Sequence, residues 1–504
     1  KQHQPEEVPR NHKCLCTWDR KDSAYAGTEA GRCGTGIGGK SVLVNENLVQ
    51  DIVQEVVAKM QIAESPGGKH GIFTDMNDAI AAAKASQTKV RRMSLDQREQ
   101  IISNIRRKTH ENAELIARMG VNETGMGNVG HKILKHKLVA DKTPGTEDLT
   151  TTAWSGDRGL TLIEMGPFGV IGAITPCTNP SETVICNSIG MIAAGNTVVF
   201  NPHPNAKKTT IFTINMINEA SLEAGGPDNI AVTVEVPTMD TSAVMMKHPA
   251  IPLLVATGGP GVVTAVLSSG KRAIGAGAGN PPALVDDTAD IRKAAKDIVN
   301  GCTFDNNLPC IAEKEIVAMD SIADELMHYM IQENGCYLAS KEIQDKLTAT
   351  VLTPKGALNR KCVGRSARAL LSMVGVEVGP EIRCIVFEGP KEHPLIAEEL
   401  MMPILGMVRV KSFEEGVETA VWLEHGNRHS AHIHSKNVDN ITTYAKAVDT
   451  AILVKNGPSY AALGFGGEGY CTFTIASRTG EGLTSTKSFT KSRRCVMSDS
   501  LCIR

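Results

Sequence analysis

Short apolar runs alternate with longer segments of helical character along the chain that follows Gly166. Each run is rich in Val, Ile or Leu and has the length of a buried strand. The predicted strands are 168–175, 196–200, 230–234 and 251–256, and the predicted helices of this stretch are 181–194 and 207–224. Strands that alternate with helices form parallel sheets with right-handed crossovers. The pattern therefore predicts an α/β fold in which ligands bind beyond the carboxyl ends of the strands.

A second α/β unit is predicted after the glycine-rich stretch 275–282, which we interpret as a domain junction. Its strand-like segments are 315–318, 404–410 and 451–454. Ahead of the first unit, residues 76–85 and 95–119 read as helices, and Gly120 is the expected cap of the second helix.

Two further segments predict β-structure outside these units. The β-prone runs 150–154 and 160–164 flank a turn that contains glycine, which is the pattern of a hairpin. The tail 484–497 alternates as an exposed or edge strand does. Because an unpaired edge strand invites aggregation, we expect the tail to pair within an oligomer.

Residues 45–61 carry apolar side chains that recur at i, i+1, i+4, i+5 and i+8, which makes a narrow apolar stripe on a helix. Asn45 or Asn47 can cap its start, and Ser65-Pro-Gly-Gly-Lys69 follows as a linker. One interpretation is an ordinary helix packed on the core. Its place between two stretches expected to be flexible favours the other, a detachable helix that docks into a groove on a partner.

Residues 1–43 are rich in glycine and polar side chains and are expected to form a flexible extension. Gly34–Ser41 matches the phosphate-binding pattern G-x-x-x-x-G-K-[ST], but no apolar strand precedes it, and a working loop of this kind needs one. Four possible zinc ligands lie in the same stretch, without the usual spacing of zinc ligands. They are His12, Cys14, Cys16 and Cys33. We expect neither a nucleotide site nor a metal site here.

Composition narrows the classes of function. Of 504 residues, 41% are hydrophobic and 21% are charged, as in globular proteins with an ample core. The net charge of −2 and the lack of a long apolar run argue against nucleic acid or membrane as the main partner. Thirteen irregularly spaced cysteines argue against a disulfide framework, and the polar start of the chain does not read as a secretory signal. The expected location is the cytoplasm.

Cys310 lies directly behind Pro309, between a polar run and an apolar run. A loop or strand end at this place can present a thiolate, which is a nucleophile. The alternative is a buried cysteine that fills core space, as free cysteines commonly do. Residue type alone favours the buried cysteine, and it is the motifs elsewhere in the chain that reverse this preference.

A group of histidines invites a metal interpretation. Its members are His425, His429, His432 and His434, of which the last two would share one face of a strand. No carboxylate or cysteine joins them at the spacing of metal ligands. We therefore expect strand and loop histidines with structural hydrogen bonds, and no metal.

Eight short motifs follow one another along the chain. They are Glu123-Thr-Gly-Met-Gly127, Ile174-Thr-Pro-Cys-Thr-Asn-Pro180, Asn201-Pro-His-Pro204, Thr257-Gly-Gly-Pro-Gly261, Gly275-Ala-Gly-Ala-Gly-Asn-Pro-Pro282, Asn307-Leu-Pro-Cys-Ile-Ala-Glu-Lys314, Lys455-Asn-Gly-Pro-Ser-Tyr460 and Gly466-Gly-Glu-Gly469. In this order they resemble the aldehyde dehydrogenase superfamily, most closely its coenzyme-A-acylating branch, the propionaldehyde dehydrogenases of bacterial microcompartments. The resemblance implies a Rossmann-type cofactor domain, an α/β catalytic domain and a small β oligomerisation arm.

The resemblance also implies a chemistry. Cys310 would attack the carbonyl carbon of a short-chain aldehyde to form a thiohemiacetal, and propionaldehyde is the expected substrate. Asn179 and the backbone amide of Cys310 would donate hydrogen bonds to the oxyanion. Hydride transfer to NAD⁺ would leave a thioester on Cys310, which coenzyme A would convert to acyl-CoA.

Cofactor contacts are implied by the same alignment. Glu399 stands at the glutamate that holds the nicotinamide ribose. Asn201 stands where many relatives have a lysine at the adenosine ribose, a substitution that weakens the distinction between NAD and NADP; NAD is the expected cofactor. The full implied set is Thr175, Pro176, Cys177, Thr178, Asn201, Pro202, His203, Pro204, Thr257, Gly258, Gly259, Gly261, Val262, Gly275, Ala276, Gly277, Glu399 and Pro403.

One departure from the superfamily bears on the second half of the reaction. Hydrolytic members keep a glutamate as general base for water where the alignment places Gly275, and residues 275–280 contain no carboxylate. A thiol with a pKa of about 8.5 supplies its own thiolate, so thiolysis is expected over hydrolysis. The alternatives are a hydrolytic aldehyde dehydrogenase, an acetaldehyde-preferring acylating enzyme, and a nucleotide-binding or scaffolding protein built on Gly34–Ser41.

The resemblance divides the chain into five parts. These are a flexible extension, 1–43; an encapsulation-type helix and linker, 44–66; a cofactor-binding domain, 67–149 and 165–275; a catalytic domain, 276–476; and an oligomerisation arm, 150–164 and 477–504. The helix at 45–61 resembles the peptide that docks this branch onto microcompartment shell proteins. The expected assembly is a homodimer or homotetramer inside a bacterial microcompartment.

Overall fold

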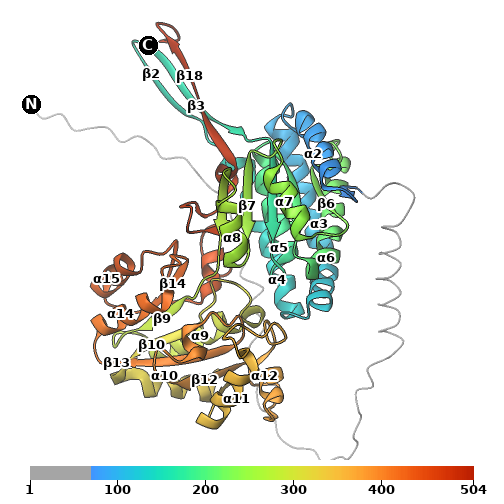
Figure 1. The fold of residues 1–504 in the computed structure, drawn as a ribbon. Coiled ribbons are helices and arrows are strands. Elements are labelled where there is room, and N and C mark those ends of the chain that lie inside the picture. Colours follow the sequence, from blue (N-terminus) through green and yellow to red (C-terminus); the bar gives the residue numbers. More distant parts are fainter. Residues whose placement is uncertain (1–69, 504) are drawn as a thin grey trace, which may run out of the picture. The chain divides into compact units, whose positions relative to one another are not determined.

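The computed structural model describes residues 70–503, which lie within one compact unit, Lys59–Arg504. The expectations for the extension 1–43, with its Gly34–Ser41 motif and possible zinc ligands, and for the helix 45–61 fall outside the described residues. The described part contains two large parallel sheets, a two-stranded sheet and a three-stranded antiparallel sheet (Figure 1).

The first sheet has six parallel strands in the order β1-β6-β5-β4-β7-β8. They are β1 (Ile72–Phe73), β4 (Val170–Thr175), β5 (Thr197–Pro202), β6 (Ala231–Val234), β7 (Leu253–Thr257) and β8 (Arg272–Ala276). The four strands predicted for this unit correspond to β4 to β7, with both ends correct to within two residues. On β5, Val198 and Phe200 belong to one core cluster and Val199 to the other. Because both faces are covered, the strands are apolar throughout, which made them visible in the sequence.

Helices cover both faces of this sheet. One core cluster joins it to α3, α4, α5 and α6, and another joins it to α2, α7 and α8. Their bounds are α2 (Met76–Val90), α3 (Leu95–Thr124), α4 (Val129–Lys142), α5 (Pro180–Ala193), α6 (Lys207–Glu223), α7 (Met239–Lys247) and α8 (Pro260–Leu267). The expected cap Gly120 is wrong, because it is buried within α3, and Gly125, with φ 71°, ends that helix instead. No helix within 70–503 is long and apolar enough to cross a membrane.

The pattern did not predict α4. Its buried side chains include Lys132, Lys135 and His136 beside Leu138 and Val139. Polar residues therefore interrupt the stripe that faces the core, and the binary pattern that marks an amphipathic helix is lost. A charged side chain on the buried face of a helix needs a partner inside the protein.

The second sheet has seven parallel strands in the order β11-β12-β13-β10-β9-β14-β15, with α9 and α10 on one face and α11 to α15 on the other. The strands are β9 (Pro282–Val285), β10 (Glu315–Met319), β11 (Cys336–Leu338), β12 (Cys384–Glu388), β13 (Ile404–Val410), β14 (Ser430–His434) and β15 (Ile452–Lys455). The helices are α9 (Ile291–Thr303), α10 (Asp320–Glu333), α11 (Lys341–Val351), α12 (Ala367–Met373), α13 (Pro394–Ala397), α14 (Phe413–Glu424) and α15 (Val438–Val448). Short 3₁₀ helices and a two-stranded sheet complete the body: η1 (Thr146–Asp148), η2 (Pro204–Ala206), η3 (Phe304–Asn307), η4 (Ser459–Leu463), η5 (Thr486–Phe489), β16 (Ile475–Ala476) and β17 (Gly482–Leu483).

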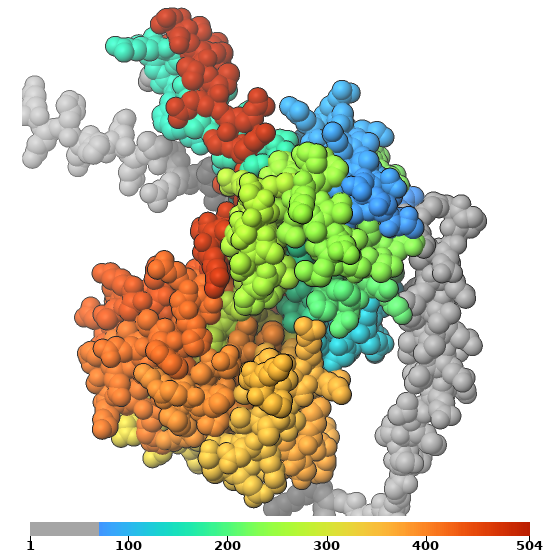
Figure 2. Space-filling model, viewed as in Figure 1, coloured from blue at the N-terminus to red at the C-terminus, as the bar shows by residue number. Residues whose placement is uncertain are grey.

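The hairpin and the tail strand form one antiparallel arm that projects from the body (Figures 1 and 2). It consists of β2 (Thr152–Gly156), β3 (Gly159–Pro167) and β18 (Thr490–Ser498), in the order β18-β3-β2. The tail therefore finds its partner strand within its own chain, from Thr490 opposite Pro167 to Ser498 opposite Gly159. The expectation that the tail must reach a second chain for its pairing is thus wrong at the level of backbone hydrogen bonds. Within the described chain, β18 and β2 are the two outer strands of this sheet.

Candidate functional site

A cleft of about 1300 Å³ opens beyond the carboxyl ends of β4, β5 and β7. The loop that carries Cys310 and the segment Gly356–Arg365 also line it. Strand order in the first sheet reverses between β4 and β7, so the cleft lies at the switch point where open α/β sheets bind ligands.

Most of the residues named from the sequence line this cleft together. They are Thr175, Pro176, Cys177, Thr178, Asn179, Asn201, Pro202, His203, Pro204, Thr257, Gly258, Gly259, Gly261, Val262, Gly277, Cys310 and Glu399. Three do not line it: Gly275, Ala276 and Pro403. A Cβ on Gly275 would lie 2.9 Å from Val263 of α8, so this glycine lets α8 pack on β8 and does not face the ligand space.

The nucleophile candidate lies in a tight loop. In η3, Asp305, Asn306 and Asn307 have φ of 51°, 53° and 66°, a left-handed conformation that side-chain contacts must hold. Lys314 supplies one of these contacts, because its Nζ donates to Asn307 Oδ1 at 2.5 Å and to the Asn307 carbonyl at 3.1 Å. Cys310 is partly exposed at the end of this loop.

The Cys310 thiol is protonated near neutral pH in the structure. Burial, as the larger cause, and the charge of Glu399 together raise its pKa to about 12. Lys314 and the backbone amides of Cys310 and Ile311 lower it. Reaction of Cys310 therefore requires either a base or a bound positive charge that favours the thiolate.

Asn179, the N-cap of α5, points its amide at the same loop. Its Nδ2 donates to the Leu308 carbonyl at 3.5 Å and to Thr178 Oγ1 at 3.4 Å. Its Oδ1 accepts from Lys135 Nζ at 2.5 Å. Because an ammonium group only donates, this contact identifies which end of the amide is oxygen and leaves the N–H groups directed toward the Cys310 loop.

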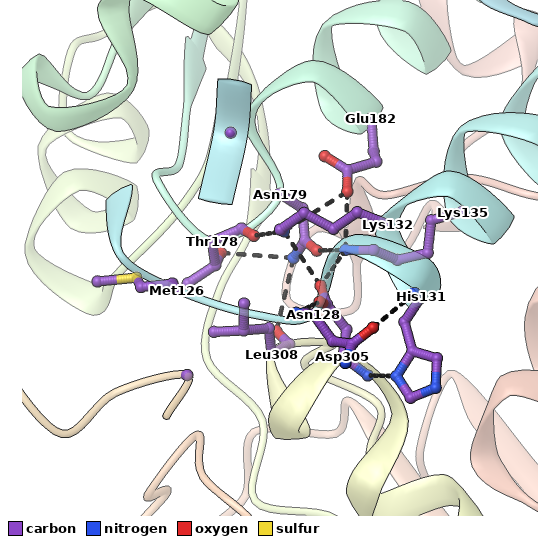
Figure 3. Close-up of polar contacts among 12 residues, drawn as sticks. Met126, Asn128, His131, Lys132, Lys135, Thr178, Asn179, Glu182, Asp305 and Leu308 are labelled. Carbon is purple, nitrogen blue, oxygen red and sulfur yellow. Dashed lines mark hydrogen bonds and ion pairs between the residues drawn. The ribbon is translucent and has the colours of Figure 1, made fainter. Parts of the chain in front are cut away.

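A cluster of buried charges joins α4, α5 and η3 behind Asn179 (Figure 3). Lys135 Nζ lies 2.8 Å from Glu182 Oε1 and 2.5 Å from Asp305 Oδ2, and Lys132 Nζ lies 3.1 Å from the same Asp305 oxygen. Burial alone would lower the pKa of Lys135, but Asp305 and Glu182 outweigh it and raise that pKa. Burial would raise the pKa of Glu182, but Lys135 and Lys132 hold it well below its ordinary range. Lys135 and Glu182 are therefore both charged at neutral pH.

Sequence reasoning missed Lys132, Lys135 and Asp305 as site residues. The one signal was lysines within an otherwise helical segment at positions that a core-facing stripe would occupy. The sequence alone does not show which face of α4 is buried, so these lysines could not be recognised as buried residues. Asp305 contacts a lysine 173 residues earlier in the chain, a pairing that no local pattern encodes.

Three members of the histidine group make hydrogen-bond contacts to protein atoms. His432 Nε2 lies 2.9 Å from the Ile311 carbonyl, and His429 Nδ1 lies 2.5 Å from Ser430 Oγ. His425 lines the cleft and contacts the Ala397 carbonyl at 2.6 Å. Among the described residues, no group of three or more His, Cys, Asp or Glu side chains is placed to hold a metal ion.

The other side of the cleft suits an extended, anionic cofactor. A Cβ on Gly258, Gly259, Gly261 or Gly277 would meet no atom within 4 Å, so the backbone borders open space. The N-terminus of α8 lies in the same stretch and favours negative charge. Arg360, Lys361 and Arg365 also line the cleft. These features fit the phosphates of NAD and of coenzyme A.

The cleft also contains two carboxylates, Glu398 and Glu399. Glu399 Oε1 accepts from the Gly279 backbone N at 3.5 Å, and burial raises its pKa. From the stretch 275–280, Gly277, Ala278 and Asn280 line the cleft, and none of them is an acid. That stretch therefore offers no general base to the ligand space.

Comparison with known proteins places this geometry in a family. The chain matches the aldehyde dehydrogenase family over residues 62–486. It is 46% identical over 461 residues to a propanal dehydrogenase (CoA-propanoylating) of Salmonella typhimurium, which covers 91% of this chain and 99% of that protein.

Solved structures agree with this match. A propionaldehyde dehydrogenase from the fucose utilisation microcompartment of Clostridium phytofermentans has a TM-score of 0.86 and 76% identity, over 86% of this chain and 100% of that chain. A propionaldehyde dehydrogenase of Rhodopseudomonas palustris, with bound CoA and an acylated cysteine, has a TM-score of 0.85 and 53% identity, over 86% of this chain and 99% of that chain.

Proposed function

Because the chain belongs to the aldehyde dehydrogenase family, we propose that it oxidises a short-chain aldehyde with NAD⁺ and coenzyme A to an acyl-CoA. The observation that carries this proposal is that the Asn179 amide contacts the loop that contains Cys310, and that both residues line the cleft. Relatives named for propanal, one of them with CoA and an acylated cysteine, favour propionaldehyde as the substrate.

In the proposed reaction, Cys310 Sγ bonds to the aldehyde carbon and the carbonyl oxygen becomes an oxyanion. Asn179 Nδ2 and the Cys310 backbone N–H donate hydrogen bonds to that oxygen, where preorganised donors lower the barrier most. When bound, NAD⁺ supplies the hydride acceptor and coenzyme A the thiol that takes the acyl group. Between these two events the acyl group stays on Cys310 as a thioester.

The cofactor residues are proposed from their places in the cleft. Gly258, Gly259 and Gly261 let backbone approach the diphosphate, and Glu399 stands where it can bind the nicotinamide ribose. Asn201 Nδ2 donates to Ser242 Oγ at 2.6 Å, so this amide is held inward and adds no cation at the adenosine ribose. The lack of a cation there supports NAD over NADP.

Thiolysis is proposed over hydrolysis because the stretch 275–280 brings no carboxylate to the ligand space. Water needs a general base to attack a thioester at a useful rate, whereas the thiol of coenzyme A ionises by itself. Glu399 is proposed to bind the cofactor and not to activate water.

We also propose a location and an assembly. One relative comes from a fucose utilisation microcompartment, and residues 45–61 carry the apolar stripe of a docking helix. This supports enclosure in a bacterial microcompartment through shell proteins. On the arm, Trp154 is 55% exposed and Val496 is 58% exposed, which supports a homodimer or homotetramer that buries them.

The proposal is tested by trapping the acyl-enzyme. The protein is incubated with propionaldehyde and NAD⁺ without coenzyme A, and its peptides are analysed by mass spectrometry. We expect a propionyl group on the peptide that contains Cys310, discharged by added coenzyme A. Cys310→Ala should carry none, whereas Cys302→Ala, which removes a buried thiol, should carry it. Release of propionate without coenzyme A would contradict the proposal.

A further inference from the structure

The ammonium group of Lys135 lies close to three oxygens from separate side chains. Asn179 Oδ1 and Asp305 Oδ2 both lie at 2.5 Å, and Glu182 Oε1 lies at 2.8 Å. Of these contacts, the one to Asn179 Oδ1 is a hydrogen bond, and those to Asp305 and Glu182 are ion pairs. Lys135 is fully buried. One cation therefore connects the N-cap of α5 to the loop that leads to Cys310 (Figure 3).

Asn179 gives up its usual structural role in this arrangement. An asparagine at an N-cap normally accepts a hydrogen bond from the helix backbone through Oδ1, which stabilises the helix. At α5 the N-cap makes no such side-chain hydrogen bond. Among the described residues, Lys135 is the donor to Asn179 Oδ1. The orientation of this amide thus depends on Lys135.

The loop that carries Cys310 is held in additional ways. Asp305 Oδ1 accepts from the Asn128 backbone N at 2.7 Å, and the Asp305 backbone N donates to His131 Nδ1 at 2.9 Å. Lys132 Nζ also pairs with Asp305 Oδ2 and donates to the Thr178 carbonyl at 3.0 Å. Loss of Lys135 therefore leaves the loop with several anchors and leaves the Asn179 oxygen with none.

We propose that Lys135 is a positioning residue that holds the Asn179 amide with its nitrogen toward the reacting carbonyl. This inference rests on the proposed function, because it deepens the role of Asn179 in that reaction. Without the ammonium group, the amide is free to rotate and cap α5 with its oxygen. The N–H donors then leave the oxyanion position, and an amide oxygen turned toward it would repel the developing charge.

The test is a double-mutant cycle between Lys135→Met and Asn179→Ala, measured as kcat for propionaldehyde oxidation with NAD⁺ and coenzyme A. Each single variant should lose about 10²-fold in kcat, as removal of one oxyanion donor does. The double variant should be no slower than Asn179→Ala, because both changes remove the same donor. A second variant, Lys135→Met with Glu182→Gln, keeps the buried charges balanced if Lys135→Met alone does not fold.

Lys132→Met is the matched control. It removes a buried ammonium of the same helix that pairs with Asp305 and Glu182 but not with Asn179. If Lys135 had a purely structural role, Lys135→Met and Lys132→Met would lower kcat to a similar extent. Each of these losses would then multiply with the loss caused by Asn179→Ala. Iodoacetamide alkylates Cys310 in a reaction that forms no oxyanion. The rate at which it inactivates the free enzyme should therefore not change in Lys135→Met.

Three outcomes separate the possibilities. If Lys135→Met slows the Asn179→Ala enzyme by the same factor as the wild type, the inference is overturned. It is equally overturned if Lys135→Met, folded and with normal iodoacetamide reactivity, keeps full kcat. If the wild type itself shows no turnover that depends on coenzyme A, the proposed function fails, and this failure is seen before any variant is compared.

Discussion

The amide nitrogen of Asn179 lies 3.5 Å from the carbonyl oxygen of Leu308, two residues before Cys310. The first residue ends the loop after β4 in one sheet unit, and the second belongs to the loop that precedes β10 in the other. The contact thus brings a hydrogen-bond donor from one half of the protein to the nucleophile of the other. An oxyanion formed on Cys310 would develop beside this donor.

Removal of this donor should slow the chemistry without weakening cofactor binding. Asn179→Ala is expected to lower kcat by roughly 10²- to 10³-fold, because the developing oxyanion loses a preorganised hydrogen bond. The KM for NAD⁺ should change little. Asn112→Ala, which removes an asparagine of α3 that bonds the Lys108 carbonyl, is the control and should keep wild-type kcat. Equal kcat values for the two variants would contradict the role of Asn179.

The reactivity of Cys310 should depend steeply on pH. Because its pKa is raised to about 12, the thiolate fraction of the free enzyme should rise about tenfold per pH unit through neutral pH, with no plateau near the ordinary thiol pKa of about 8.5. Inactivation by iodoacetamide measures this fraction. Glu399→Gln removes a charge that raises the pKa and should speed inactivation at any given pH. Glu398→Gln, its exposed neighbour, should not. A plateau near pH 8.5 in the wild type would refute the assignment.

Buried histidines should make the fold sensitive to mild acid. Burial lowers the pKa of His136, His429 and His432 to about 4 and that of His434 to about 3. In the unfolded chain these histidines have a pKa of about 6.5, so below that pH they bind protons that they do not bind in the folded chain. The free energy of unfolding therefore falls as pH falls. Each histidine can contribute on the order of 3 kcal/mol to this loss. The urea midpoint should therefore drop between about pH 7 and about pH 5, and less in His434→Gln. A constant midpoint would contradict these pKa shifts.

Arg360 should matter more for coenzyme A than for the aldehyde. It lines the cleft, and its charge further lowers the pKa of His203, which burial already lowers. A charge-assisted hydrogen bond to a phosphate contributes about 1.5–3 kcal/mol, so Arg360→Ala should raise the KM for coenzyme A roughly tenfold or more. Arg368→Ala removes an exposed arginine of α12 outside the cleft and is the control. Similar KM values for coenzyme A in the two variants would contradict a role of Arg360 in binding coenzyme A.

The parts of the fold that a local pattern can express were predictable. The strand 404–410 was predicted with its exact bounds, because a strand buried on both faces is a continuous apolar run. The helix α4 was not, because Lys132 and Lys135 occupy its buried face. Their burial is possible only because Asp305 and Glu182 meet them there, and that meeting depends on the tertiary fold.

The site shows the same division. Asn179, Cys310 and most of the cofactor residues were named through short motifs, since close backbone approach and nucleophilic chemistry restrict residue type within a few positions. Gly275 and Ala276 were included because they lie inside such a motif, yet they face the core. Which side of a strand end faces the ligand depends on packing against α8, and the motif does not contain that information.

The central claim is that Cys310 transfers an acyl group to coenzyme A. The most direct measurement is NADH formation from propionaldehyde and NAD⁺, with and without coenzyme A, for the wild type and Cys310→Ala. We predict steady turnover in the wild type only when coenzyme A is present, and none in Cys310→Ala. Steady turnover of the wild type without coenzyme A would mean that the cleft activates water, and would contradict the acylating account.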